Sequence, residues 1–335
     1  MKKLLLTLTV LFFWSSNYAQ EIAQKKESTF KGIKKVMVNA DFCTLKMIGY
    51  NKQELTFTGI IKSNENQEAY QIKISQEQDI LHVNVVKPEE WISHWGELTL
   101  MLPQGISVDA VSQSGKIEVN DLQELNLSVR SESGHIVINS VQGTVAVNTG
   151  VGNLSVSDFT GDLKSNTKTG NVKVESLKGN CNISCYNGAI AISDVQGKLS
   201  VQGGTGNQEV EKVDGDINLK SSSGHMKLSN AKGNILCKTF NGNLKLFNVE
   251  GAYTIQSSKG NIVGTRVAFT TSSSFTTTEG NVKIQMDTKS NLAFELKSDN
   301  SFLRALGKSR KKSLKIGKGD ILITGNSTTG SQAYY

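Results

Sequence analysis

Large apolar side chains are scarce in this sequence. Only 37% of its 335 residues are hydrophobic and 7% are aromatic, which suits a thin, elongated core better than a large globular one. Beyond the first twenty residues, no apolar run is long enough to form a membrane-spanning helix. The composition therefore argues against a helical membrane protein and favours an extended fold.

Recognisable catalytic signatures are lacking as well. The chain contains no P-loop, HExxH, GxSxG or CxxC pattern, and its four histidines are scattered. His135 and His225 occupy equivalent turn positions of the repeat described below, but they lie five coils apart, too far to share a metal ion. We expect no catalytic residues, no cofactor and no metal site.

The four cysteines form no metal-binding pattern. Cys181 and Cys237 fall on apolar positions of the repeat, whereas Cys43 and Cys185 have no obvious partner. Although export would favour disulfides, we predict buried free thiols.

Residues 1–19 have the composition of a cleaved secretory signal. Lys2 and Lys3 precede an apolar run, Leu4–Trp14, that is too short to span a bilayer. We expect cleavage near Gln20 and, since no cysteine lies near that point, a non-lipidated protein in the periplasm or at the cell surface. Loss of the two lysines lowers the formal charge from +7 to +5, which permits attraction to anionic envelope polymers without indicating nucleic acid.

Glycine recurs at a fixed interval through the middle of the chain. Fifteen glycines, from Gly134 to Gly260, each lie nine residues after the last. The residue two after each glycine is apolar in fourteen cases, with Gln208 the exception. The residue four after is apolar in thirteen, with Ser165 and Gly264 the exceptions. Period-two alternation bounded by glycine turns predicts half-buried strands.

A period of eighteen residues is superimposed on the shorter one. Two residues before every other glycine lies an apolar side chain, at Val141, Phe159, Leu177, Val195, Val213, Ala231 and Val249. The alternate positions are mostly polar or small: Gly150, Lys168, Tyr186, Gly204, Ser222, Phe240 and Ser258. The structural unit is therefore eighteen residues long, with two unequal nine-residue halves.

Three architectures could produce this pattern. The calcium-binding β-roll shares the nine-residue period, but its motif needs an aspartate where this chain has its first buried apolar residue. A membrane barrel needs strands of ~9–11 residues, which a nine-residue repeat that includes its turn cannot supply. A soluble meander of hairpins needs a second layer to cover its apolar face, and the sequence shows no helical pattern that could form one. We therefore predict an all-β parallel β-solenoid, or β-helix, whose seven coils between Gly134 and Gly260 make a rod of roughly 34 Å at ~4.8 Å per coil.

The turn residues have predicted structural roles. Glycine recurs because the turn backbone needs positive φ or a close approach to the next coil. Asparagine follows glycine at positions such as Asn153, Asn171 and Asn243. Either asparagine is there because it favours turns, or its amides form a stacked ladder along one corner of the rod, and its role is structural in both cases.

The flanking segments are rich in strand patterns but lack the repeat, so we expect them to cap the open ends of the solenoid. The predicted organisation is a signal peptide (1–19), a flexible N-terminus (20–29), an N-terminal β segment that caps the solenoid (30–111), the repeat array (112–285), a C-terminal β cap (286–325) and a disordered tail (326–335).

The combination of "LPQGISVDAVSQSGKIEV" with tandem "SG-x-I-x-V" and "GN-I-x-V" units resembles the bacterial putative-adhesin family of β-strand-repeat proteins, a domain of unknown function. The resemblance covers residues 33–325. It implies an exported, non-enzymatic surface or periplasmic protein, and it brings no active-site residues with it.

Two basic features are candidate binding sites. In the solenoid, Lys173, Lys227 and Lys245 would stack on one outward strip, with the last two on neighbouring coils ~4.8 Å apart. Ala191 and Glu209 interrupt the row, so the strip is broken. The basic run 308–318 is the densest charge in the chain. We predict weak, salt-sensitive binding to an acidic glycan, lipopolysaccharide or another envelope component through the strip or the run.

Two tryptophans form a third candidate. Trp91 and Trp95, with His94 beside them, could stack on a sugar or a partner. The favoured interpretation is that they cover the first coil of the rod, because most tryptophans are largely buried.

The predicted function is that of a non-enzymatic exported β-solenoid scaffold, an adhesin or envelope-interaction protein. The alternative is a polysaccharide-acting enzyme, a lyase or hydrolase on a β-helix. Glu209 and Glu211 would lie ~6.7 Å apart along one strand, and Glu175 two coils from Glu211 at ~10 Å. Such distances approach those of glycosidase carboxylate pairs, but two glutamates on an outer strand are more often a solvated face.

Overall fold

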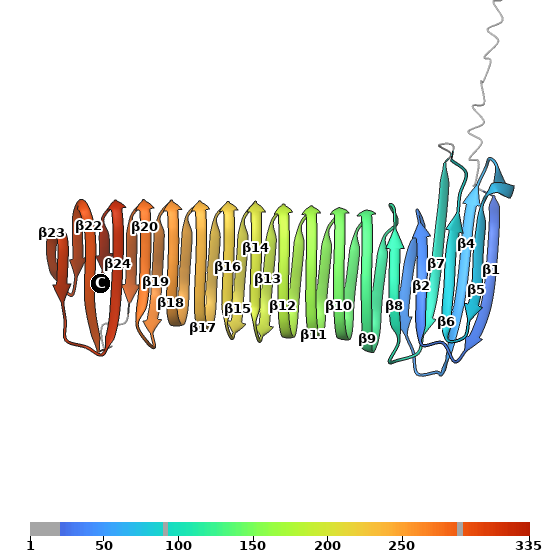
Figure 1. Cartoon of the computed structure of the whole chain (residues 1–335), viewed down its shortest axis with the longest axis horizontal. Coiled ribbons are helices and arrows are strands. Elements are labelled where there is room, and N and C mark those ends of the chain that lie inside the picture. The colour runs from blue at the N-terminus through green and yellow to red at the C-terminus, as the bar shows by residue number, and fades with distance from the viewer. Residues whose placement is uncertain (1–20, 90–92, 287–290) are drawn as a thin grey trace, which may run out of the picture.

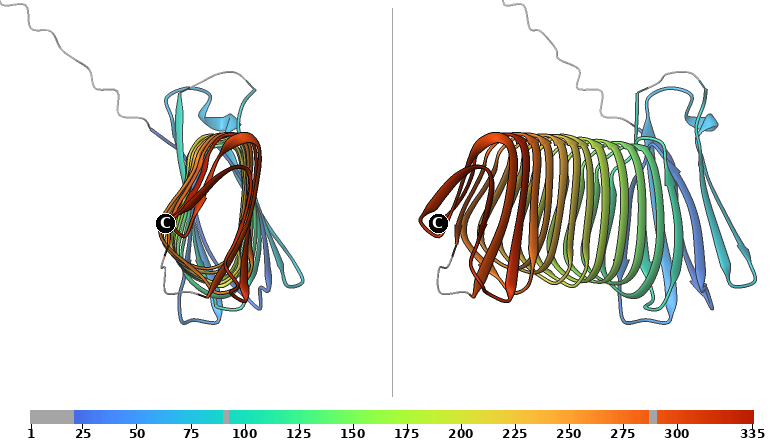
Figure 2. Two further views of the ribbon diagram at one scale, coloured as in Figure 1. Left: turned by 90° about the vertical axis from the view of Figure 1, so that its left-hand side faces the viewer. Right: turned by 60° about the vertical axis from the view of Figure 1, so that its left-hand side comes forward.

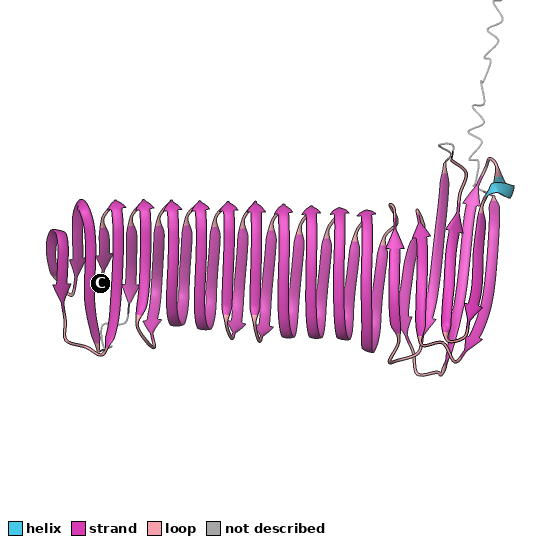
Figure 3. Ribbon diagram, viewed as in Figure 1, coloured by secondary structure: helices cyan, strands magenta, loops and turns pink. Residues whose placement is uncertain are grey.

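The protein is a straight β rod that is broadest at its N-terminal end (Figure 1). The computed structural model describes residues 21–89, 93–286 and 291–335. Within these residues the only helical element is a single 3-10 turn, η1 (Gln67–Ala69), and strands make up nearly all the rest (Figure 3). Viewed along its axis, the rod is a flattened oval (Figure 2).

The middle of the rod is a parallel β-solenoid with an eighteen-residue coil. Equivalent residues of successive coils pair side by side, as in the series Ile136, Leu154, Val172 and Ile190. The strands are β9 (Ile117–Ser133), β10 (Ile136–Val151), β11 (Leu154–Thr169), β12 (Val172–Asn187), β13 (Ile190–Gln196), β14 (Leu199–Thr205), β15 (Gln208–Asp214), β16 (Ile217–Ser223), β17 (Met226–Asn241) and β18 (Leu244–Lys259). The predicted parallel solenoid with eighteen-residue coils is confirmed.

Each coil presents two faces to solvent. We count a coil from a glycine such as Gly188, so that the first face holds residues two to five after it and the second face residues ten to sixteen after it. On the first face Ile190 and Ile192 are buried, whereas Ala191 between them is exposed. The apolar positions of the repeat therefore point inward, as the alternation predicts, and stacked coils bury them against one another.

Both predicted reasons for glycine at the turns, positive φ and close approach to the neighbouring coil, apply in the structure. Gly170 has a φ of 138°, a backbone conformation that L side chains rarely adopt. A Cβ atom on this residue would also overlap the carbonyl oxygen of Gly152 in the preceding coil. Any larger residue would therefore force two coils apart.

A second turn column is built without glycine. The residue six after the first glycine of each coil is left-handed, as at Asp158 (φ 50°), Asp194 (φ 55°) and Asn230 (φ 52°). Asp and Asn tolerate this conformation better than other non-glycine residues. The column bends each coil at the end of the first face.

The predicted amide ladder exists, and its hydrogen bonds run from side chain to backbone. The Asn153 Oδ1 atom accepts the backbone N–H of Asn171 at 2.8 Å, and Asn243 accepts that of Asn261 at 2.9 Å. His225 replaces asparagine in this column, and its Nδ1 atom accepts the N–H of Asn243 at 3.0 Å. These bonds satisfy corner N–H groups that strand pairing leaves free.

The N-terminal end continues both faces as two open sheets. On the first face β3, β7, β4 and β1 follow β9 in that order, and on the second face β8, β2, β6 and β5 do so. The strands are β1 (Ile22–Lys31), β2 (Lys35–Asp41), β3 (Thr44–Gly49), β4 (Glu54–Ser63), β5 (Gln71–Glu77), β6 (Ile80–Val86), β7 (His94–Leu102) and β8 (Ser107–Ser112).

The prediction that residues 20–29 are flexible is wrong. Residues 22–29 belong to strand β1, which pairs antiparallel with β4 from Ile22 opposite Lys62 to Lys31 opposite Glu54. It is an edge strand with mostly exposed side chains, so it lacks the apolar alternation that marks a buried strand.

The C-terminal end is closed by a cap that folds back on itself. Its strands are β19 (Ile262–Phe269), β20 (Ser273–Glu279), β21 (Val282–Met286), β22 (Leu292–Ala305), β23 (Lys308–Ile316), β24 (Ile321–Thr329) and β25 (Gln332–Tyr334). Strand β24 lies between β20 and β22, and β25 lies between β21 and β22. Strand β23 pairs antiparallel with β22 and closes the rod.

The prediction of a disordered tail at residues 326–335 is therefore wrong. Its inward positions include Ser327 and Gln332, which are buried and hydrogen-bonded to each other at 2.9 Å. The Gln332 amide also donates to the carbonyl oxygen of Lys297 at 2.8 Å. Buried polar residues that hydrogen-bond to one another give a segment the same composition as a disordered one. The polar composition of residues 326–335 therefore led to the wrong prediction.

All four cysteines are buried free thiols, as predicted. Burial raises the pKa of Cys181 and Cys237 to about 12, so both thiols stay protonated at neutral pH.

Candidate functional site

The predicted lysine strip lies outward on the first face, and Lys227 and Lys245 are paired neighbours, as the repeat predicts. Two of the three lysines are ion-paired, however. The Lys173 Nζ atom lies 2.8 Å from a carboxylate oxygen of Glu175, and Lys227 lies 2.6 Å from Glu209. This hydrogen bond to Glu209 raises the pKa of Lys227.

The first face as a whole carries no net charge. In the seven coils that begin at Gly134 to Gly242, its outward residues three and five after the glycine include three lysines and three glutamates. Glu209, which interrupts the lysine column itself, and Glu175 and Glu211 in the next column therefore balance the strip, so it is a mixed surface and not a basic one.

At the N-terminal end, Trp95 is 43% exposed on β7, and the Lys62 Nζ atom lies 5.4 Å from its ring centroid. It therefore does not cover the first coil as a buried residue. Trp91 lies outside the described residues. His94 is the residue that packs inward, with its Nδ1 atom 3.1 Å from the Tyr70 hydroxyl and its ring centroid 3.9 Å from that of Phe42.

The basic run 308–318 forms most of a projecting terminal hairpin, which we define as residues 302–318, from the end of β22 through β23 (Figure 1). Residues 308–313 are all exposed. From Arg304 to Lys318 the chain has seven cationic residues and no acidic one. None of the seven forms an ion pair with any residue that the structure describes.

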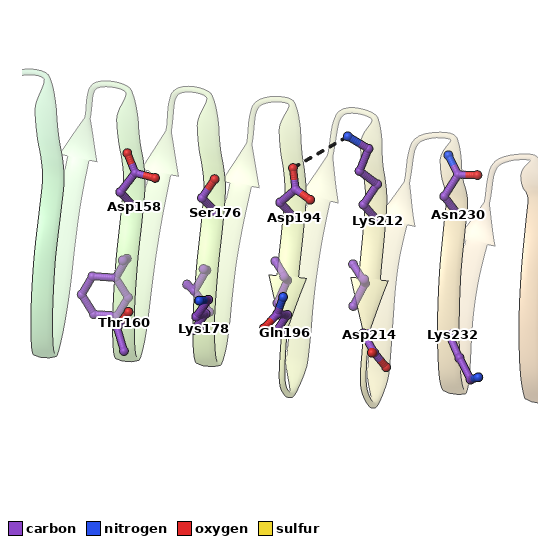
Figure 4. A pocket seen from close by; sticks show the side chains of 14 residues that line it. Asp158, Thr160, Ser176, Lys178, Asp194, Gln196, Lys212, Asp214, Asn230 and Lys232 are labelled. Carbon is purple, nitrogen blue, oxygen red and sulfur yellow. Dashed lines mark ion pairs between the residues drawn. The ribbon is translucent and has the colours of Figure 1, made fainter.

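An open groove of about 630 Å³ runs across five coils, along the turn column in which residues such as Asp158 and Asp194 have positive φ (Figure 4). Its rims together carry three aspartates and three lysines, and Asp194 and Lys212 face each other across neighbouring coils at 3.8 Å. The floor side chains, such as Leu177 and Val195, are fully buried. Because every coil bends at this position, the groove follows from the fold and shows no preference for one kind of charge.

The glutamates of the enzymatic alternative are each engaged by a neighbour. Glu175 and Glu209 are the ion-pair partners of Lys173 and Lys227, and the Glu211 carboxylate accepts the Asn230 side-chain amide at 3.2 Å. The arrangement is that of a solvated face with local pairing.

Within the described residues, no group of three or more His, Cys, Asp or Glu side chains is placed to hold a metal ion. In the same residues, no helix is long and apolar enough to cross a membrane.

The fold and these surfaces define a capped β-solenoid repeat protein. Residues 49–236, more than half of the chain, match the Toastrack DUF4097 family, and the chain belongs to that family. The resemblance to β-strand-repeat adhesins of unknown function, predicted from the sequence, is confirmed.

Among solved structures, the chain is similar to a putative cell adhesion protein from Clostridium sporogenes at 12% identity and a TM-score of 0.25, covering 94% of this chain and 99% of that one. It is also similar to a putative adhesin from Parabacteroides merdae at 13% identity and a TM-score of 0.26, covering 78% and 95%. A putative adhesin from Bacteroides fragilis matches at 10% identity and a TM-score of 0.24, covering 95% and 98%. No curated protein matches the chain. Similarities this low carry no information about ligands.

Proposed function

We propose that this protein is a non-enzymatic, exported scaffold that attaches by its terminal hairpin to the phosphate-bearing lipid surface of the cell envelope. The observation that carries the proposal is the distribution of charge. The whole chain has 37 cationic and 30 acidic residues, and seven of the cations lie between Arg304 and Lys318 without an acidic neighbour. The remainder of the chain therefore has no net charge, and the hairpin holds all of the surplus.

The hairpin also exposes apolar side chains beside its cations. Phe302 is 58% exposed, and the Lys311 Nζ atom lies 4.9 Å from its ring centroid. Leu306, at the tip of the hairpin, is 40% exposed. Cations that neutralise phosphate groups, next to apolar side chains that enter the interface, are the combination that peripheral lipid-binding segments use.

Export is part of the proposal. Residues 1–19 have the charge and apolar pattern of a secretory signal, which supports a mature chain in the periplasm or at the cell surface, without a lipid of its own. In either place the rod would hold its N-terminal end away from the surface that the hairpin contacts.

Lysines on an edge strand have a second physical effect, because they prevent edge-to-edge pairing between molecules. The test must separate this effect from lipid binding. It compares the chain without residues 1–19 with a variant in which Lys308, Arg310, Lys311 and Lys312 are all changed to Gln. The matched control changes Lys173, Lys227 and Lys245, the predicted strip of the first face, to Gln.

The measurement is co-sedimentation with vesicles of zwitterionic lipid, with and without anionic phospholipid or lipopolysaccharide. Each cation near an anionic surface contributes about 1 kcal/mol, so four substitutions should weaken binding by about 10³-fold. Binding of the unchanged protein should fade as the screening length falls from ~10 Å at 0.1 M salt to ~3 Å at 1 M.

Unchanged binding by the hairpin variant would contradict the proposal. So would a variant that binds normally but forms higher oligomers, because the cations would then only protect the edge. If the first-face variant loses binding and the hairpin variant does not, the site is the predicted lysine strip.

A further inference from the structure

The second face of the rod carries two exposed aromatic rings in one column. Tyr186 and Phe240 both lie sixteen residues after the first glycine of their coils, and they are 65% and 63% exposed. Isolated exposed apolar residues are common on protein surfaces. These two are not isolated, because they share a column and Leu236, which is 38% exposed, lies on the same strand as Phe240.

Small residues separate the two rings. Between them the column contains Gly204 and Ser222. The Tyr186 ring lies against the bare backbone of Gly204, since a Cβ atom there would come within 3.1 Å of its Cδ2 atom. A shallow pocket of about 190 Å³ extends from Gly203 past Phe240 to Ser258, and Lys220 and Lys238 also line it.

Charge on this face is of one sign. In the seven coils that begin at Gly134 to Gly242, the outward residues twelve, fourteen and sixteen after the glycine include Lys164, Lys168, Lys220 and Lys238 and no acidic residue. None of these lysines forms an ion pair within the described part of the chain. The two aspartates of the face, Asp162 and Asp216, lie at its edge, ten residues after the glycine. Each accepts a hydrogen bond from the side-chain amide of the asparagine one coil later.

We propose that the second face binds a linear acidic polysaccharide that runs parallel to the rod. The rings of Tyr186 and Phe240 would stack on the apolar faces of sugar units, and Lys220 and Lys238 would pair with their carboxylates. Three coils separate the rings, ~14 Å at the spacing of stacked strands, so the site spans several sugar units and not one. The small residues Gly204 and Ser222 leave room for the part of the polysaccharide between the two rings.

The first face does not offer the same site. In the seven coils that begin at Gly134 to Gly242 it has as many glutamates as lysines, and its one exposed aromatic ring there, Phe247, is covered by the Arg266 guanidinium at 4.4 Å. The groove along the bend is also balanced in charge. The second face alone combines free aromatic rings with unpaired cations, and this proposal does not depend on lipid binding by the terminal hairpin.

The test uses the chain without residues 1–19 and fluorescently labelled alginate oligomers, a linear uronic-acid polymer, with labelled dextran as the neutral probe. Tyr186→Ala and Phe240→Ala are combined in one variant, and Lys220→Gln and Lys238→Gln in another. Both pairs of side chains are exposed, so folding should be kept. The matched controls, both on the first face, are Phe247→Ala for the aromatic variant and Lys227→Gln with Lys245→Gln for the charge variant.

Fluorescence anisotropy should show binding of alginate and none of dextran. Each second-face variant should raise the dissociation constant for alginate by about tenfold or more, as removal of central interface residues does. The controls should leave it unchanged.

Three results would overturn the proposal. The first is no binding of alginate by the unchanged protein, and the second is equal binding of dextran. The third is loss of binding in the lysine variant with none in the aromatic variant, which would reduce the effect to unspecific charge.

Discussion

At the scale of single residues, the exceptional residue Gln208 is accommodated by a glycine beside it, Gly203. Gln208 breaks the column of apolar residues, yet it is fully buried, and its amide donates to the carbonyl oxygen of Lys220 at 2.7 Å. Its side chain occupies the space beside Gly203, where a Cβ atom would overlap the Gln208 amide nitrogen. The missing side chain of Gly203 and the long side chain of Gln208 therefore form one packing unit.

This pairing predicts a coupled pair of substitutions. Gly203 has no positive φ, so only the lack of space forbids a side chain there. Gly203→Ala alone should lower the free energy of unfolding by about 1–3 kcal/mol, the usual cost of overpacking. In a Gln208→Ile background the same change should cost clearly less, because the clash is gone. Denaturant titrations of the four proteins measure the coupling, and strictly additive effects would contradict the packing account.

At the scale of elements, the N-terminal cap contains a pH-sensitive contact. His94, at the start of β7, packs between Phe42 and Tyr70. Partial burial, and then the nearby Lys87 ammonium, lower the pKa of His94 from its usual value of 6.5, while Asp41 acts in the opposite direction. The folded cap therefore favours the neutral ring.

The sign of the pH effect follows from this direction. Below about pH 6.5 the unfolded cap takes up a proton that the folded cap resists, so the cap loses stability as the pH falls through this range. Hydrogen exchange of β7 should therefore accelerate between pH 7.5 and pH 5.5 relative to mid-rod strands, after correction for the intrinsic rate. A His94→Gln variant, which cannot titrate, should lose this difference. If the variant keeps it, another group is responsible.

The elements also show what the sequence could establish. The period of eighteen and the inward positions, such as Ile190 and Ile192, follow from stacking of identical coils and were predictable. The tail was not, because buried Ser327 and Gln332 have the polarity of an exposed segment. Strand β1 was missed for the opposite reason, since an exposed edge needs no apolar alternation.

The candidate surfaces were predictable only in part, because charge on a solenoid is set by neighbouring columns. The column of Lys173 and Lys227 holds more lysines than glutamates when it is counted alone. Glu209, the partner of Lys227, lies in that column one coil earlier, but Glu175, the partner of Lys173, lies in the next column. The aromatic pair Tyr186 and Phe240 was present in the column of polar and small positions. The signal that could have found it is the combination of large rings with Gly204 and Ser222 between them.

At the scale of the whole molecule, the rod separates two different ends. The C-terminal hairpin holds the surplus of positive charge and exposes Phe302, whereas the N-terminal end holds Trp95 on an open β sheet. A solenoid is rigid along its axis because each coil is hydrogen-bonded to the next. Attachment through the hairpin therefore requires that one end of the rod contacts the lipid surface and the other end does not.

The most direct test of this account is the orientation of the bound rod. The chain without residues 1–19 has two tryptophans, Trp91 and Trp95, and Trp95 lies on β7 at the N-terminal end. In the same shortened chain, Phe302→Trp combined with Trp91→Phe and Trp95→Phe leaves one fluorophore, on the terminal hairpin. Anionic vesicles whose acyl chains carry bromine quench tryptophans that enter the interface. The account predicts strong quenching of the hairpin fluorophore and little of the native tryptophans. Quenching of the native tryptophans with none at the hairpin, or equal quenching of both, would contradict it.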